Sequence, residues 1–458
     1  MRVRQTLLCR PTATSRTMAG LTAAVITLGA AATPSPAAPP PRLPQPSSAV
    51  SDRDQTFSDS DDVPMRAATP DKRISYTRWG TRSVRQGRFV GTRHQDGVEI
   101  GPGTTPVLYR DPYGTSGRLA YDRGRWFSPW VKPGFGLTEL IASYTASTPV
   151  GTFIEISARG RTASGQESSW DSLGRWANHD RRFHRMSLGA QDDDLSRIAV
   201  DTLVTRPGVS LDSWQLRMSL FRRTDSGKTP TLTTVGATAS RLPAASPTSQ
   251  PLAGGGISLK VPKYSQEIHA GEYPQWDGGG EAWCSPTSTS MLLAYWGTGP
   301  TPRQYAWVND DYRQPWVDYA ARHTYAWGYD GTGDWPYNTA YAGSFGLDSF
   351  VTRLRSLREA ELFIRAGIPL VASIGFDAGE LDGSPLTSTA GHVSVIRGFT
   401  DSGRVIVNDT AAPTAKSVRR VYKRGQFENA WLDTSGGVVY VIRPASTPLP
   451  APKRHSNW

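Results

Sequence analysis

The stretch Ala282-Trp-Cys-Ser-Pro-Thr287 is the part of the sequence that decides the fold. The residues after it space their apolar side chains by three and four positions and stop at Gly297, which predicts a helix with one buried face. Ser285 favours a helix start, and Pro286 fits a first turn. We therefore expect Cys284 at or just before a helix N-terminus, where unpaired amide groups and the helix dipole stabilise a thiolate.

The bulk composition predicts two globular domains. The chain has 458 residues, of which 38% are hydrophobic, 10% aromatic and 20% charged, which is typical of folded rather than disordered proteins. The formal net charge is +11, but the basic residues are scattered and form no run typical of nucleic-acid binding. Solubility is the favoured explanation of this charge, and weak attraction to anionic cell-wall polymers is the alternative.

The N-terminus has the pattern of an export signal. A basic segment is followed by a short run rich in small apolar residues, which predicts a signal peptide over residues 1–38 with an ambiguous cleavage site. Residues 39–71 are rich in Pro, Ala and Ser and then acidic, which predicts a disordered linker or pro-segment. No later run is apolar enough to span a membrane, so we expect a secreted or cell-wall-associated protein.

Only two cysteines are present, Cys9 and Cys284. Cys9 lies in the predicted leader and would be lost with it. Cys284 would then have no partner for an internal disulfide, which calls for a chemical role. A buried, unreactive thiol is the alternative, and the cysteine count alone favours neither.

Residues 72–224 predict an all-β sandwich of jelly-roll type, because short apolar–polar alternations are separated by Gly, Pro, Asp and Ser. Four tryptophans fall in this segment, and we favour a place for them in the sandwich core over exposed stacking on sugar rings or a protein partner. They are Trp126, Trp130, Trp170 and Trp176.

The second half predicts an α+β domain. Residues 225–256 are rich in Ser, Thr, Pro and Gly and predict an interdomain linker. In residues 257–444 helical patterns come first and strand patterns later, which indicates an antiparallel sheet with helices. Residues 445–458 are Pro-rich and predict a flexible tail.

A thiol nucleophile needs a base and a group that orients the base. His392 follows a glycine at the start of an apolar strand, and Asp409 ends the next strand. Adjacent strands joined by a turn would bring the two side chains together, which is the pairing that fixes a histidine tautomer. Asn408 is the neighbouring alternative, but consecutive strand residues face opposite ways.

Acyl transfer also needs hydrogen-bond donors for the developing oxyanion. The backbone N–H of Cys284 can supply one donor. A side-chain amide upstream can supply the other, with Gln266 as the first candidate and Gln275 as its competitor.

Residues 261–443 resemble the peptidase C39-like family, which are papain-fold cysteine peptidases related to the bacteriocin-leader processing peptidases. The matching pieces are Val261-Pro-Lys-Tyr-Ser-Gln266, Trp283-Cys-Ser-Pro286, Gly331-Thr-Gly-Asp-Trp-Pro-Tyr-Asn338, Gly367-Ile-Pro369, Gly391-His392 and Val407-Asn-Asp409. The resemblance implies a papain-like fold with Cys284 as thiolate, His392 as base, Asp409 as orienting carboxylate and Gln266 in the oxyanion hole.

Two residues depart from the family pattern: Ser285 stands where the family usually has Gly, and Thr410 where Pro is common. Trp335 and Tyr337 are candidates, with Trp283, for the lining of a substrate groove. A tightly packed loop is the alternative for the glycine-rich segment that contains Trp335 and Tyr337.

We therefore predict a secreted cysteine peptidase that hydrolyses peptide or isopeptide bonds in a protein or cell-wall peptide. The same triad would serve a peptidoglycan stem-peptide amidase or an acyltransferase. A further alternative is a wall- or glycan-binding protein in which the sandwich contacts glycan and the papain-like domain is silent. No cofactor and no metal are expected, since one cysteine and dispersed histidines lack ligand spacing.

Overall fold

A computed structural model describes residues 72–451 and 457–458. The predicted signal peptide (1–38) and the predicted linker or pro-segment (39–71) lie outside the described residues. None of the helices in the described part of the chain is long and apolar enough to cross a membrane.

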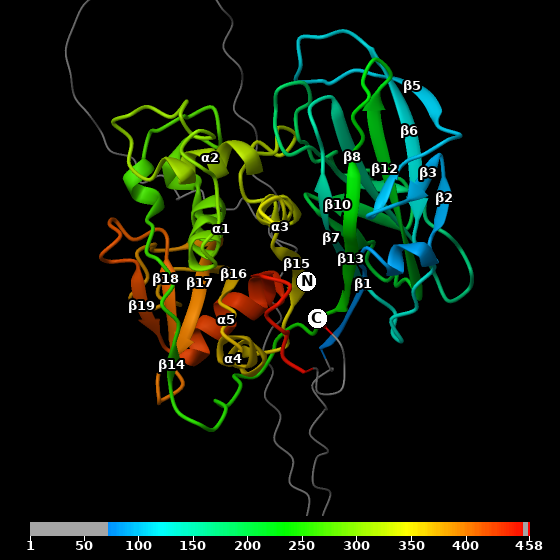
Figure 1. Ribbon diagram of the computed structural model, residues 1–458. Helices are drawn as coiled ribbons and strands as arrows, with labels where there is room; N and C mark the ends of the chain where they lie inside the picture. Colours follow the sequence, from blue (N-terminus) through cyan, green and yellow to red (C-terminus); the bar gives the residue numbers. More distant parts are fainter. Residues whose placement is uncertain (1–71, 452–456) are drawn as a thin grey trace, which may run out of the picture. The chain divides into compact units, whose positions relative to one another are not determined.

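The N-terminal half of the described chain forms two antiparallel sheets (Figure 1). The strands of one sheet are β1 (Arg73–Trp79), β3 (Thr92–His94), β4 (Val98–Ile100), β7 (Glu139–Ser147), β10 (Ser196–Ala199), β11 (Thr202–Thr205) and β13 (Thr231–Arg241). Their order is β10-β11-β7-β13-β4-β3, with β1 also paired to β13. We call this the seven-stranded sheet.

The strands of the other sheet are β2 (Arg88–Val90), β5 (Thr105–Tyr109), β6 (Leu119–Phe127), β8 (Thr152–Arg161), β9 (Asp171–Trp176) and β12 (Ser213–Arg223). Their order is β2-β6-β12-β8-β9, with β5 also paired to β6. A single 3-10 turn, η1 (Ser83–Gln86), precedes β2. We call this the six-stranded sheet.

Alternating side chains explain why the two sheets share a core. Along β12, Leu216, Met218 and Leu220 are fully buried, and the residues between them point to the other side of the sheet. Ala142 and Tyr144 of β7 belong to the same apolar cluster, so the inner faces of the two sheets pack together. The predicted β-rich N-terminal domain is confirmed.

The predicted linker over residues 225–256 is wrong for its middle part. β13 occupies Thr231–Arg241 and pairs with β7 along almost its whole length. Its sequence is rich in Thr, Ala, Ser and Gly, which is why it resembles a linker. These small residues suit a central strand with neighbours on both sides, and Ala237 and Ala239 have no exposed surface.

The C-terminal half contains a third sheet, also antiparallel. Its strands are β14 (Ile257–Ser258), β15 (Asp348–Arg353), β16 (Leu370–Phe376), β17 (Thr389–Phe399), β18 (Val405–Asp409), β19 (Arg419–Tyr422) and β20 (Val438–Arg443). Their order is β15-β20-β16-β17-β18-β19, with β14 also paired to β17. Apart from β14, these strands come after the first helical segments of this half, as the sequence pattern predicts.

The helices of this half are α1 (Cys284–Tyr295), α2 (Pro315–Thr324), α3 (Trp335–Gly343), α4 (Leu357–Arg365) and α5 (Arg424–Ser435), with the short turns η2 (Gln266–His269) and η3 (Gly280–Ala282) before α1. Their apolar side chains form two clusters with the sheet, one that contains Met291 of α1 and Val395 of β17, and one that contains Trp431 of α5 and Ile396 of β17. The sheet is thus covered on both faces.

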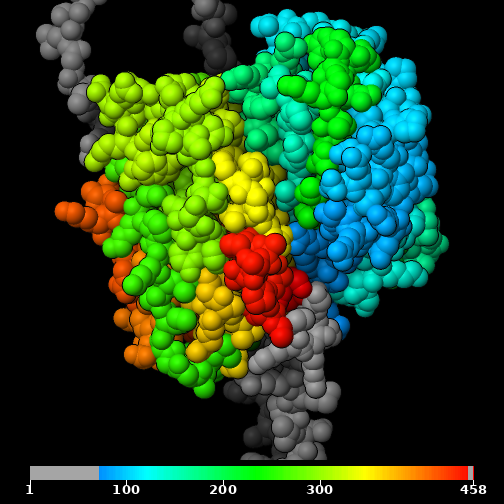
Figure 2. All heavy atoms as spheres, viewed as in Figure 1, coloured from blue at the N-terminus to red at the C-terminus, as the bar shows by residue number. Residues whose placement is uncertain are grey.

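The predicted flexible tail over residues 445–458 is wrong for its last two residues. Asn457 is fully buried, and its amide donates to the backbone carbonyl of Arg353 at 2.7 Å. The Trp458 ring lies 5.0 Å from the Phe363 ring of α4. Figure 2 shows the red end of the described chain lying against the gold surface of this region.

The described residues belong to one compact unit, within which the two halves share buried hydrogen bonds. The guanidinium of Arg185, which has no exposed surface, donates to the carbonyls of Ala177, Tyr325 and Arg322. Thr238 of β13 donates to the carbonyl of Val351 in β15 at 3.0 Å. These contacts join the sandwich sheets to the third sheet and its helices.

Replacing Arg185 by Met should lower the free energy of unfolding by about 3 kcal/mol, because three buried carbonyls lose their donor. The matched control is Arg182→Met, which removes an exposed guanidinium and should change stability by no more than about 0.5 kcal/mol. Chemical denaturation of both variants measures the difference. Equal stabilities for the two variants would contradict the importance of these hydrogen bonds.

Candidate active site

Cys284 is the first residue of α1, as the sequence pattern predicts, and its side chain is fully buried. Trp283 before it is held by a hydrogen bond from its indole Nε1 to the carbonyl of Trp276 at 2.7 Å. Ser285 after it shares a hydrogen bond with the Tyr440 hydroxyl at 2.8 Å. The start of α1 is therefore fixed on both sides of the cysteine.

Cys284 is present as a half-cystine in this structure. The sequence has one other cysteine, Cys9, which lies outside the described residues. Any chemistry of the Cys284 thiol therefore concerns the reduced form of the protein.

β17 and β18 bring His392 and Asp409 together. Asp409 lies opposite Ser394, so it shares a face of the sheet with His392, two residues away. The His392 Nε2 and the Asp409 Oδ1 are 2.8 Å apart, and both side chains are 1% exposed. Asn408 points the other way, and its amide donates to the carbonyl of Pro262 at 2.9 Å.

The Asp409 carboxylate is held in its charged form. The Tyr422 hydroxyl donates to Oδ2 at 2.7 Å, and the backbone N–H of Ala411 donates to Oδ1 at 3.2 Å. Burial works against ionisation, but the charge of His392 and the hydrogen bonds from three neighbours keep the pKa of Asp409 below its ordinary value of 3.8.

An ionised Asp409 only accepts hydrogen bonds, so it selects the tautomer of His392 that carries a proton on Nε2. The other ring nitrogen, Nδ1, has no hydrogen-bond partner among the described residues. The arrangement therefore leaves Nδ1 free to accept a proton.

Gln266 lies in η2 and is 2% exposed. Its Oε1 accepts a hydrogen bond from the Thr410 hydroxyl at 2.8 Å, and its Nε2 donates to the carbonyl of Glu281, three residues before Cys284. An amide nitrogen has two N–H groups, and the neighbouring Glu267 carboxylate also accepts a hydrogen bond from Gln266. The competing candidate, Gln275, is exposed to solvent.

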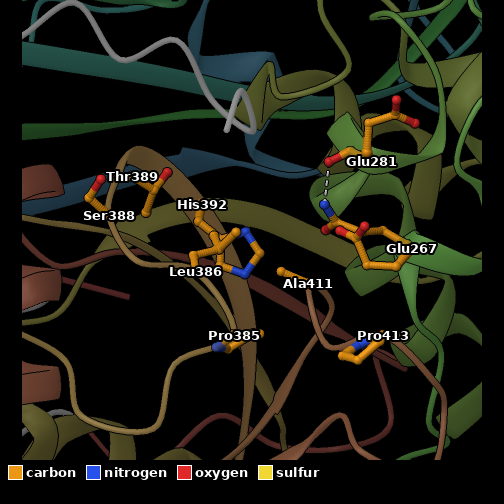
Figure 3. A pocket seen from close by; sticks show the side chains of 10 residues that line it. Glu267, Glu281, Pro385, Leu386, Ser388, Thr389, His392, Ala411 and Pro413 are labelled. Carbon is orange, nitrogen blue, oxygen red and sulfur yellow. Dashed lines mark hydrogen bonds between the residues drawn. The ribbon is translucent and has the colours of Figure 1, made fainter. Parts of the chain in front are cut away.

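Gln266 and His392 line the same cavity, which has a volume of about 240 Å³ (Figure 3). Its other lining residues are Glu267, Glu281, Pro385, Leu386, Ser388, Thr389, Ala411 and Pro413. Cys284 follows Glu281 closely and belongs to the same apolar cluster as Val393, the residue after His392. Of the predicted catalytic residues, Gln266 and His392 line the cavity, whereas the fully buried Cys284 does not.

The predicted substrate-groove residues do not line this cavity. Trp283 is fully buried, Trp335 is 7% exposed and Tyr337 is 2% exposed. The Tyr337 hydroxyl donates to the carbonyls of Arg175 and Met186 in the sandwich. The expectation of a groove is corrected: these aromatic side chains are packed in the interior, and the alternative of a packed loop fits the glycine-rich segment.

Sequence reasoning missed Tyr422 and the loop that carries Pro385 to Thr389. Tyr422 ends β19, a four-residue strand in which two of the residues are arginines, so no apolar alternation marks it. The loop and the first residue of β17 together contribute four of the ten cavity residues, and they have no repeating pattern. Neither feature carries a local sequence signal.

A second buried polar group includes the last residue of η2, His269. One ligand atom each from His269, Glu272 and Asp318 lie within 4.8 Å of one another, so these residues could hold a metal ion. The His269 Nδ1 and the Glu272 Oε2 are 2.7 Å apart, which is an ordinary hydrogen-bond distance. Although burial opposes its charge, the two carboxylates raise the pKa of His269, so an ion pair explains the group without a metal.

Neutralising Asp409 tests whether its charge stabilises the fold. Its folded-state pKa is lowered, so the stabilisation is present above pH 3.8 and is lost as the pH falls through the folded value. Asp409→Asn should be less stable by about 3 kcal/mol at neutral pH, as when one partner of a buried pair is removed. The difference from the parent protein should shrink below pH 3.8 in denaturation measured across pH. A difference that stays constant would contradict a contribution from charge.

Tyr337→Phe tests the corrected role of Tyr337. Loss of the hydroxyl removes the hydrogen bonds that Tyr337 makes to two buried carbonyls, each of which keeps its backbone N–H donor, and leaves the buried ring without its polar contact. It should lower the free energy of unfolding by about 1 kcal/mol. The control, Tyr113→Phe, removes a hydroxyl from a residue that is 42% exposed and should have no effect. A Tyr337→Phe variant with unchanged stability but a raised KM for substrate would instead support the original prediction that Tyr337 lines a substrate groove.

Comparison with known proteins finds two family models that match this chain. A family model described as "Peptidase C39 N-terminal domain" matches residues 74–240, and one described as "Peptidase_C39 like family" matches residues 258–439. Together the two matches cover more than half of the chain. A search of curated proteins found no match.

Solved structures add two weak similarities. A protein from Bacillus anthracis described as a C39-like peptidase has 18% sequence identity and a TM-score of 0.28, over 42% of this chain and 98% of that chain. A structure described under the carbohydrate-binding modules of the β-sandwich superfamily has 13% identity and a TM-score of 0.14, over 37% of this chain and 56% of that chain. Both structural similarities are too weak to identify a relative. On the two family models, the chain belongs to the peptidase C39-like family, with a peptidase C39 N-terminal domain before the C39-like domain.

Proposed function

We propose that this protein is a secreted cysteine peptidase that hydrolyses peptide or isopeptide bonds through Cys284, His392 and Asp409. The observation that carries the proposal is the His392–Asp409 hydrogen bond at the wall of the cavity, with Nδ1 left as a proton acceptor. Membership of a peptidase family supports the reaction class.

In the proposed reaction the reduced Cys284 thiol gives its proton to Nδ1 of His392, and the thiolate attacks the carbonyl carbon of the scissile bond. The tetrahedral oxyanion accepts hydrogen bonds from the backbone N–H of Cys284 and from Nε2 of Gln266. His392 then returns the proton to the leaving amine as the C–N bond breaks. Water, deprotonated by His392, hydrolyses the thioester and restores the thiol.

Asp409 supports each proton transfer without becoming protonated. Its lowered pKa keeps it ionised at neutral pH. The hydrogen bond to Nε2 fixes the ring and stabilises the imidazolium that forms after proton transfer. Tyr422 in turn fixes the carboxylate through Oδ2.

The pH dependence of Cys284 alkylation by iodoacetamide tests the proposal. The full chain is reduced, treated across pH and digested, so that mass spectrometry separates the peptide of Cys284 from that of Cys9. Alkylation of Cys284 should proceed well below the ordinary thiol pKa of about 8.5, and His392→Ala should abolish this low-pH reactivity. A thiol that reacts only near pH 8.5 in both proteins would overturn the Cys–His pair.

Gln266→Ala should lower kcat/KM for peptide hydrolysis by about 10²-fold, the usual effect of losing one oxyanion donor. Gln275→Ala is the matched control and should keep full activity, because that side chain is exposed. Assays with a panel of peptides and peptidoglycan stem peptides give both values. Equal loss in the two variants, or loss in Gln275→Ala alone, would contradict the assignment.

A further inference from the structure

The outer face of the six-stranded sheet gathers arginines from strands that are distant in the sequence. Along β6, β8 and β12 the residues that alternate with the core point outward, and many of them are basic. We call this surface the arginine face; it consists of Arg88, Arg123, Arg125, Arg159, Arg161 and Arg217, all half-buried or exposed.

Two half-buried tryptophans hold part of the arginine face in place. The Arg159 guanidinium lies 4.8 Å from the Trp130 ring and 4.7 Å from the Trp170 ring. Arg161 lies 4.3 Å from Trp130, and Arg217 lies 4.7 Å from Trp170. The guanidinium groups are thereby oriented in advance, and the indole rings are already covered by cations rather than presented to a sugar or a base.

The charge of this face is not balanced by its carboxylates. Glu155 pairs with Arg175 at 2.6 Å, and Glu167 pairs with Arg159 and Arg161. Among the described residues, no ion pair forms with the other members, Arg88, Arg123, Arg125 and Arg217. Burial lowers the pKa of Arg217; the charge of Glu155 opposes this shift, and the neighbouring Arg125, Arg123 and Arg159 add to it.

The geometry suits a chain of anions rather than a single one. Arg123 and Arg125 are two residues apart on β6, about 7 Å along the strand, and Arg217 lies on the adjacent strand opposite Phe127, diagonal to Arg125. A guanidinium fork matches the oxygens of a phosphate group in two parallel hydrogen bonds. A polymer with phosphates repeated every few ångströms would meet several of these groups at once.

We propose that the arginine face binds a polymer whose repeating anionic group is phosphate and which carries no nucleobases. Single-stranded nucleic acids are held by aromatic rings on which bases stack, and here both indole rings are covered by guanidinium groups. This inference does not depend on the proposed peptidase activity.

The test is the binding of labelled inorganic polyphosphate to the full-length protein by fluorescence anisotropy, over a series of salt concentrations. The triple variant Arg123→Gln, Arg125→Gln, Arg217→Gln should weaken binding at least tenfold. It should also reduce the slope of log K against log salt by about 1 for each arginine that contacts a phosphate. The same three positions changed to Lys should recover part of the affinity, because charge is kept but the fork is lost.

The matched control is Arg93→Gln, Arg197→Gln, Arg206→Gln, which removes the same charge from the seven-stranded sheet and its margin. This control should bind polyphosphate within twofold of the parent protein. Equal weakening in the two triple variants would show attraction to net charge alone and overturn the proposal, as would unchanged binding in the first variant. Thermal denaturation confirms that each variant is folded before binding is compared.

Two further probes test the identity of the polymer. Polyglutamate should bind more weakly than polyphosphate of the same number of charges. Single-stranded DNA should bind no more tightly than polyphosphate of the same number of charges, because its bases should add no affinity. Polyglutamate that binds as tightly as polyphosphate, or DNA that binds more tightly through the same arginines, would overturn the proposed ligand.

Discussion

The hydrogen bond between His392 and Asp409 is the constraint on which the rest of the candidate site depends. It exists because β17 and β18 pair in the register that sets Asp409 opposite Ser394, on the same face as His392. A shift of that register by one residue would turn Asn408 toward the histidine and Asp409 away from it. The buried carboxylate stays ionised through its neighbours, and its charge then fixes the tautomer of His392.

The sequence predicts the elements that carry the candidate catalytic residues better than it predicts what surrounds them. Cys284 at a helix start, His392 on one strand and Asp409 on the next follow from local patterns, and the structure has α1, β17 and β18 where these patterns place them. Aromatic residues near a cysteine motif carry no such information, because burial and exposure of a ring depend on distant segments. Trp283 and Tyr337 are therefore misjudged, and Tyr422 cannot be found without the fold.

Composition also misleads where tertiary structure overrides it. β13 resembles a linker because its residues are small, yet small residues are what a central strand between close neighbours accommodates. The arginine face cannot be recognised from the order of residues in the sequence. It forms because one side of a sheet presents every second residue of several strands that are distant in the sequence. The two departures from the family pattern have structural uses: Ser285 bonds to Tyr440, and Thr410 holds the Gln266 amide.

Arg185 and Tyr337 reach across the boundary between the two family-defined segments, and each satisfies backbone carbonyls of the other half. Each of these hydrogen bonds needs a residue from both segments. The sequence of one segment therefore cannot change at these positions in evolution without affecting the other. In a peptidase segment recombined with a foreign N-terminal partner, an aromatic hydroxyl would lack its acceptors and two backbone carbonyls would lack their donor. All three groups would lie on the surface that contacts the new partner. Gene fusion or exchange should therefore move these two segments as a pair, and their sequences should diverge together.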